Sequence, residues 1–74
     1  MIGRIHEECT YCITVQEHID EDSFNAEGPH RINVLKSDSV LSRFTVRTDQ
    51  SGLIGVIRQL HRDGYLLISL TREP

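Results

Sequence analysis

The sequence has no tryptophan, only two cysteines and two prolines, and no long apolar run. Two cysteines are too few for the disulfide framework of a small secreted domain. No segment approaches the roughly 18 apolar residues of a membrane span, and the N-terminal residues lack the apolar stretch of a signal peptide. We therefore expect a cytoplasmic protein that does not associate with membranes.

Positive charge is also limited. Eight Lys and Arg residues against eleven Asp and Glu residues give a formal net charge of −3 at pH 7. This balance provides no general attraction to nucleic acid, which is therefore not an expected partner. Charged residues (26%) and hydrophobic residues (38%) occur at the levels of an ordinary folded domain, which argues against disorder.

The chain is short, and its 74 residues form one predicted domain, 1–74. A domain of this size buries only roughly 60–65% of its unfolded surface, and a single core at this scale rarely supplies more than about 3–5 kcal/mol. Because a second subunit is a common source of further stability, we expect a homodimer.

The clearest pattern predicts a helix over residues 50–63. Its apolar residues recur at helical spacing and form one arc, while Gly55 falls on the opposite, polar arc. Asp49 is placed to cap the first turn, and Gly64 suits the left-handed position that ends a helix. The apolar arc, with a histidine packed at its border, consists of Leu53, Ile54, Val56, Ile57, Leu60 and His61.

Alternating apolar and polar residues predict four strands, over residues 10–19, 31–36, 40–48 and 65–72. Residues 20–29 are acidic, end in Gly-Pro and are predicted to form a solvated loop. The expected fold is therefore α+β, a small β-β-β-α-β domain with a four-stranded sheet and one amphipathic helix on one face. Short connections favour a right-handed crossover that leaves the strands beside the helix parallel.

The same alternation assigns side chains to the two faces of the sheet. Phe44 and Val46 are expected to point inward, and so are three apolar residues of the last strand, Leu66, Ile68 and Leu70. One helix about 10 Å wide is narrower than four strands about 4.8 Å apart, so the second face should stay uncovered. It carries Cys12, Thr14, Gln16, His18, Arg43, Thr45, Arg47, Leu67 and Ser69. This mixture is compatible with a solvated face, a dimer interface or a ligand platform.

Two patterns suggest metal binding, but neither has the required geometry. Cys9 and Cys12 form a C-x-x-C motif, yet positions three apart in a strand face opposite sides of the sheet. No second Cys or His pair completes a zinc site, unless a turn or a dimer contact assembles one. In the acidic stretch that begins at Asp20, the fifth position is Phe24, where an EF-hand needs an oxygen ligand. We expect no metal, no cofactor and no catalytic residue.

Gly55 is an unusual residue for the interior of a helix, where glycine costs about 1 kcal/mol relative to alanine. Either a partner subunit or a small ligand approaches that backbone closely, or the position tolerates a suboptimal residue.

Two resemblances involve this helix. The run Asp49-Gln50-Ser51-Gly52-Leu53-Ile54-Gly55, with Arg58-Gln59-Leu60 and the strand after Gly64, resembles a group of short bacterial proteins that have no assigned activity. The strand Tyr11-Cys12-Ile13-Thr14-Val15 resembles the one with which those proteins begin. This resemblance covers about half of the chain and implies a fold more than a function.

The helix start also resembles that of ACT-type regulatory domains, in which a strand leads into Asp-x-Pro-Gly-Leu. Asp49-Gln50-Ser51-Gly52-Leu53 matches this pattern, with Ser51 in place of proline. In ACT domains this turn often binds amino acids at a subunit interface, which implies Asp49, Gln50 and Gly52 as ligand residues. ACT domains have two strand–helix–strand halves, whereas one helix is predicted here.

Three functional hypotheses follow. The first is a non-catalytic homodimeric module that acts as a regulatory or accessory protein by binding a partner. The second is an ACT-like sensor that binds a small molecule at the turn from Asp49 to Gly55. The third is a small enzyme on the helix-free sheet face, with Arg43, Arg47, His18 and Ser69. The candidate ligand or interface residues are Asp49, Gln50, Gly52, Gly55, Arg43 and Arg47.

Overall fold

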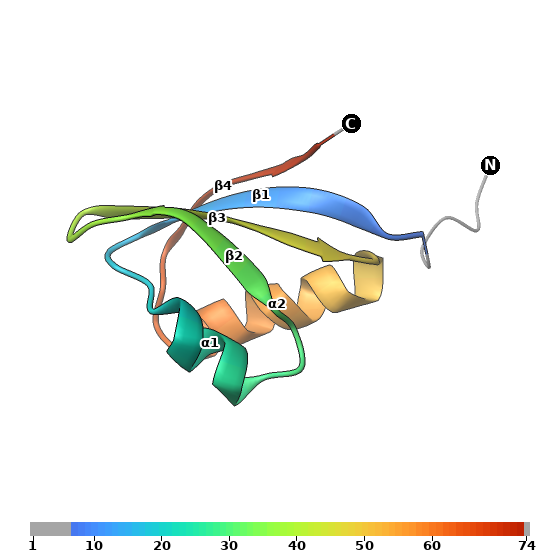
Figure 1. Cartoon of the computed structure of the whole chain (residues 1–74), viewed down its shortest axis with the longest axis horizontal. Helices are drawn as coiled ribbons and strands as arrows, with labels where there is room; N and C mark the ends of the chain where they lie inside the picture. Colours follow the sequence, from blue (N-terminus) through green and yellow to red (C-terminus); the bar gives the residue numbers. More distant parts are fainter. Residues whose placement is uncertain (1–6, 74) are drawn as a thin grey trace.

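The computed structural model describes residues 7–73 and contains a layer of strands packed on a layer of helices. Its elements are β1 (Cys9–Gln16), α1 (Glu21–Glu27), β2 (Ile32–Ser37), β3 (Leu41–Thr48), α2 (Gln50–Arg62) and β4 (Leu67–Arg72). The predicted domain also includes residues 1–6 and 74, which lie outside the described residues. Both helices lie on the same face of the sheet (Figure 1). The predicted α+β class and four-stranded sheet are confirmed.

The sheet is antiparallel throughout and has the strand order β2-β3-β1-β4. Since β3 and β4 each run antiparallel to β1, they are parallel to each other, as the crossover through α2 requires. The chain therefore consists of two strand–helix–strand units, β1-α1-β2 and β3-α2-β4, in the split arrangement of ferredoxin-like domains.

Helix α1 is the main departure from the sequence prediction, which was wrong to make residues 20–29 a loop. The Asp20 carboxylate caps this helix by accepting hydrogen bonds from the N–H groups of Asp22 and Ser23, at 3.1 and 3.3 Å. Phe24 is its one buried residue, and the centroids of the Phe24 and Phe44 rings are 6.3 Å apart. Because a seven-residue helix is not stable alone, packing against the sheet decides its formation.

Helix α2 has the ends that the sequence predicts. The Asp49 carboxylate accepts the Gly52 N–H at 2.8 Å, and Gly64 adopts the left-handed conformation, with a φ of 87°. The N–H of Gly64 donates to the carbonyl of His61, and that of Tyr65 to the carbonyl of Leu60. These two bonds form a Schellman motif, which turns the chain away from the helix axis and toward β4.

The core lies between the sheet and the two helices. Phe44 and Val46 are buried in it, as predicted. Ile19 is buried too, although β1 ends at Gln16 instead of continuing to residue 19 as predicted. A positive φ of 72° at Glu17 turns the chain there. The buried apolar residues are Tyr11, Ile13, Val15, Ile19, Phe24, Ile32, Phe44, Val46, Val56 and Leu60.

Strand β4 is less covered than predicted. Leu66 and Ile68 were expected to point inward with Leu70, but they are 59% and 51% exposed. Helix α1 packs against β2 and α2 packs against β3, while every residue of β4 except Leu70 is exposed. A register shift in the pairing of β1 with β4 leaves Ile68 without a partner residue. His61, expected to pack beside the apolar arc of α2, is also exposed.

Candidate functional site

The two edges of the sheet differ in their protection, and the edge at β2 is closed by side chains of α1. Asn25 accepts the Ile32 N–H at 2.8 Å and donates to the Ile32 carbonyl at 3.3 Å. Glu21 accepts the Val34 N–H at 2.8 Å. Glu21 and Asn25 are four positions apart and therefore lie on one side of the helix. They occupy backbone groups with which another strand would pair.

The edge at β4 has no such protection. No side chain among residues 7–73 hydrogen-bonds to the backbone of β4. The Glu73 N–H donates to the Thr10 carbonyl at 2.8 Å. Because neighbouring residues of an antiparallel strand alternate in direction, Thr71 and Ser69 also face β1, whereas the N–H groups of Leu70 and Arg72 face outward. An open row of backbone donors and acceptors is a template for another strand.

Apolar side chains accompany this open edge. Leu66, Leu67 and Ile68 are 59%, 41% and 51% exposed. A hollow of about 240 Å³ adjoins them and is lined mostly by apolar side chains: Ile57, Leu60, His61, Tyr65, Leu66 and Leu67. The open edge thus combines unpaired backbone groups, exposed apolar side chains and an apolar hollow. We call this combination the β4 edge.

The predicted site residues do not form one site. Asp49 uses its carboxylate to cap α2, and Gln50 beside it is exposed. Gly52 is buried, because the Thr48 side chain and the His30 ring occupy the space that a side chain would need. These residues lie on the helical side of the molecule.

Two further predicted residues, Arg43 and Arg47, are exposed on the opposite, helix-free face. Their partners in the ladder with β1 are Thr14 and Thr10. The Arg47 guanidinium lies 3.7 Å from the Glu8 carboxylate, an exposed pair of the kind that contributes little to stability. None of the described pockets lies on this face. The two arginines therefore do not share a site with the turn at Asp49.

The close approach suspected at Gly55 occurs within the chain. A Cβ at Gly55 would lie 2.8 Å from Nε2 of His30, so the imidazole packs directly against the helix backbone. His30 comes from the loop between α1 and β2. Sequence reasoning missed this pairing because the conformation of that loop depends on α1.

The residues proposed for an enzyme are also separated. Ser69 pairs with Thr14 in the sheet, while Nδ1 of His18 lies 2.7 Å from Oγ of Ser37. The Ser37 hydroxyl also lies 2.8 Å from the Ser42 hydroxyl and 3.3 Å from the Ile19 carbonyl, and Ser42 donates to the Glu17 carbonyl at 2.7 Å. These contacts join the segment after β1 to the β2–β3 hairpin.

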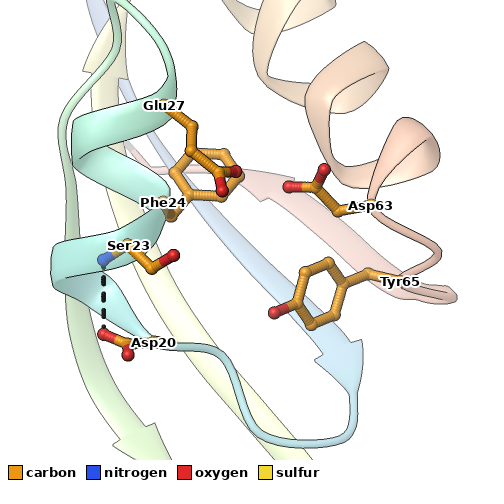
Figure 2. Close-up of a pocket in the computed structure, with 6 residues that line it drawn as sticks. All are labelled: Asp20, Ser23, Phe24, Glu27, Asp63 and Tyr65. Carbon is orange, nitrogen blue, oxygen red and sulfur yellow. Dashed lines mark hydrogen bonds between the residues drawn. The ribbon is translucent and has the colours of Figure 1, made fainter.

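Figure 2 shows a second cleft, of about 210 Å³, between α1 and the C-terminal end of α2. The carboxylates of Asp20, Glu27 and Asp63 line it, together with the ring of Tyr65. Burial raises the pKa of the Tyr65 hydroxyl, and the negative charges of Asp63, Glu17, Asp20 and Glu27 raise it further. This cleft therefore has a negative potential.

The cysteines do not form a joint site, because Cys9 packs against the core while Cys12 pairs with Thr45 on the helix-free face. Across residues 7–73, no three His, Cys, Asp or Glu side chains are arranged to hold a metal ion. Neither of the described helices has the length and apolar composition to cross a membrane. No protein-family model, curated protein or solved structure matches the chain.

Proposed function

We propose that this protein is a non-catalytic interaction module that dimerises by pairing the β4 edges of two copies. The observation that carries the proposal is the difference between the sheet edges. Asn25 and Glu21 occupy the backbone groups of β2, whereas the outward groups of β4 have no partner among residues 7–73.

A second copy of the chain fits the chemistry of the β4 edge. Two identical edges related by a two-fold axis pair antiparallel, and every contact then occurs twice. The outward N–H groups of Leu70 and Arg72 would donate to the partner strand. Each copy also offers both exposed leucine and isoleucine side chains and an apolar hollow to receive them. The two four-stranded sheets would become one continuous sheet.

The remaining exposed area supports an apolar contact of useful strength. Full burial of one leucine or isoleucine side chain stabilises by about 1.5–3 kcal/mol. Leu66, Leu67 and Ile68 are roughly half exposed, so each retains about half of that gain for the dimer. A domain this small has a limited core. Burial of the β4 edge in a dimer would therefore add to the stability of the fold.

Sedimentation velocity over a range of protein concentrations tests the proposal. The unmodified protein should sediment as a dimer that dissociates on dilution, and Ile68→Lys should sediment as a monomer, since a charge on an edge strand opposes pairing. The control is Leu35→Lys, which introduces the same charge at a residue 56% exposed on the protected strand β2. A monomeric unmodified protein, or equal dissociation of both variants, would contradict the proposal.

A second candidate is small-molecule sensing of the ACT type, and the presence of α1 favours it. The chain has two strand–helix–strand units, where the sequence indicated one. The sensing hypothesis then depends on Gln50, because Asp49 is committed to the cap and Gly52 is covered. It predicts that an amino acid in a thermal-shift panel raises the Tm and that Gln50→Ala removes the gain. The same gain in Gln50→Ala would exclude this turn.

A further inference from the structure

A cleft of about 430 Å³ lies between the α1–β2 loop and α2, and it shares no lining residue with the hollow of the β4 edge. Gly28, Pro29 and His30 form one wall. Gly55, Arg58 and Arg62 form the other wall, on α2. The volume is within the range of small-molecule sites. Gly28 and Gly55 contribute no side chains that would fill the cleft. The residues suggest which chemistry the cleft would accept.

Positive charge is concentrated on the α2 wall. Arg58 and Arg62 are four positions apart and so project on the same side of the helix. Arg58 forms no ion pair within residues 7–73. Arg62 lies 3.5 Å from the carboxylate of Asp63, but its side chain is 63% exposed, so this pair neutralises it only weakly. Two guanidinium groups beside an imidazole are suited to a carboxylate or phosphate group.

Gln59 provides a fixed acceptor in the same cleft. It is buried, and its Nε2 donates to the Phe24 carbonyl at 3.0 Å, which holds the amide in one orientation. Its Oε1 occupies the space next to Gly28 where a side chain would otherwise lie. This oxygen accepts no hydrogen bond from the described residues. The carboxylate of Glu27 also lines the cleft. It would repel an anion that has no hydrogen-bond donor to offer it.

We propose that this cleft binds a small hydroxylated organic anion. The carboxylate or phosphate group lies between Arg58, Arg62 and His30, and a hydroxyl group donates to Oε1 of Gln59 or to the carboxylate of Glu27. Gly55 has a role in this site, because only a residue without a side chain lets the His30 ring lie against α2 and leave the cleft open.

NMR titration of the ¹⁵N-labelled protein tests this site, with ribose 5-phosphate, malate and inorganic phosphate added at constant ionic strength. We expect saturable shifts at the Gly28 and Gly55 amides and at the Gln59 side-chain amide. The organic anion with the lower Kd identifies whether phosphate or carboxylate is the preferred group. Inorganic phosphate should bind more weakly than that organic anion, since it lacks a sugar or carbon hydroxyl.

Two variants separate this site from general charge effects. Arg58→Gln should weaken binding by roughly tenfold or more, the value of a charge-assisted contact. Arg43→Gln removes the same charge from the helix-free face and should leave the Kd unchanged. An equal loss in both variants, an equal Kd for inorganic phosphate and the organic anions, or shifts that do not saturate for any of the three probes would overturn the proposal.

Discussion

Replacement of Gly55 by alanine tests the contact that links α2 to the α1–β2 loop. In a helix interior this change normally stabilises by about 1 kcal/mol, because alanine loses less backbone entropy on folding. Here the new Cβ would lie 2.8 Å from Nε2 of His30, closer than carbon and nitrogen atoms can pack. The imidazole must shift away from the helix, and its packing there is weakened. We therefore expect no gain, or a loss, in the free energy of unfolding.

The contact with His30 is isolated by a double-mutant cycle. In His30→Ala, the ring is absent, so Gly55→Ala should recover its gain of about 1 kcal/mol. The coupling between the two positions is then roughly 1 kcal/mol or more. Urea unfolding monitored by far-UV circular dichroism, at one fixed protein concentration, measures it. A gain of the same size in both backgrounds would refute the account of Gly55.

Three further predictions concern the supports of the sheet. Asn25→Ala should lower the free energy of unfolding by about 1–3 kcal/mol, since both backbone groups of Ile32 lose their partner; concentration-dependent aggregation should also appear in light scattering. Ser42→Ala should cost a similar amount, about 1–3 kcal/mol, in urea unfolding, because the buried hydroxyl bonds Ile19 and Glu17. The pKa of the Asp38 carboxyl is lowered by the N–H groups at the β2–β3 turn, so its stabilisation is present at neutral pH and is lost as the pH falls through that pKa. The difference in Tm between the unmodified protein and Asp38→Asn should therefore disappear in acid, and a difference that persists there would contradict this assignment.

The sequence predicts the second strand–helix–strand unit well because its signals are local. Helical spacing, the cap at Asp49 and the left-handed Gly64 all lie within the segment that they define. The inward positions of Phe44 and Val46 follow from strict alternation in β3. Local chemistry decides these elements, so neighbouring residues are sufficient to predict them.

The first unit was harder to predict because its contacts are distant in the sequence. Helix α1 has one buried apolar residue, Phe24, and is held by Asn25 and Glu21 at the edge of β2. Without α1, Gly55 appeared to lie on a polar surface. In the structure, Gln59 bonds to the carbonyl of Phe24 and Gly55 contacts His30.

The candidate sites could not be predicted for a related reason. Which strand is at the edge depends on the strand order, and alternation does not give that order. The run Leu66-Leu67-Ile68 was a usable signal, because three consecutive apolar residues do not fit a strand with one solvated face. The cleft beside Arg58 could not be predicted, because its second wall depends on the position of His30, and no local sequence pattern indicates that position.

Amide hydrogen exchange in β4 tests the proposed dimer most directly. The N–H groups of Leu70 and Arg72 point away from β1, and no residue from 7 to 73 pairs with them, so a partner strand would protect them. We predict slow exchange at concentrations where the dimer forms and fast exchange after dilution. Thr71, which faces β1, serves as an internal reference that is protected in both conditions. Fast exchange at Leu70 and Arg72 at every concentration, with Thr71 still protected, would contradict pairing of the β4 edges.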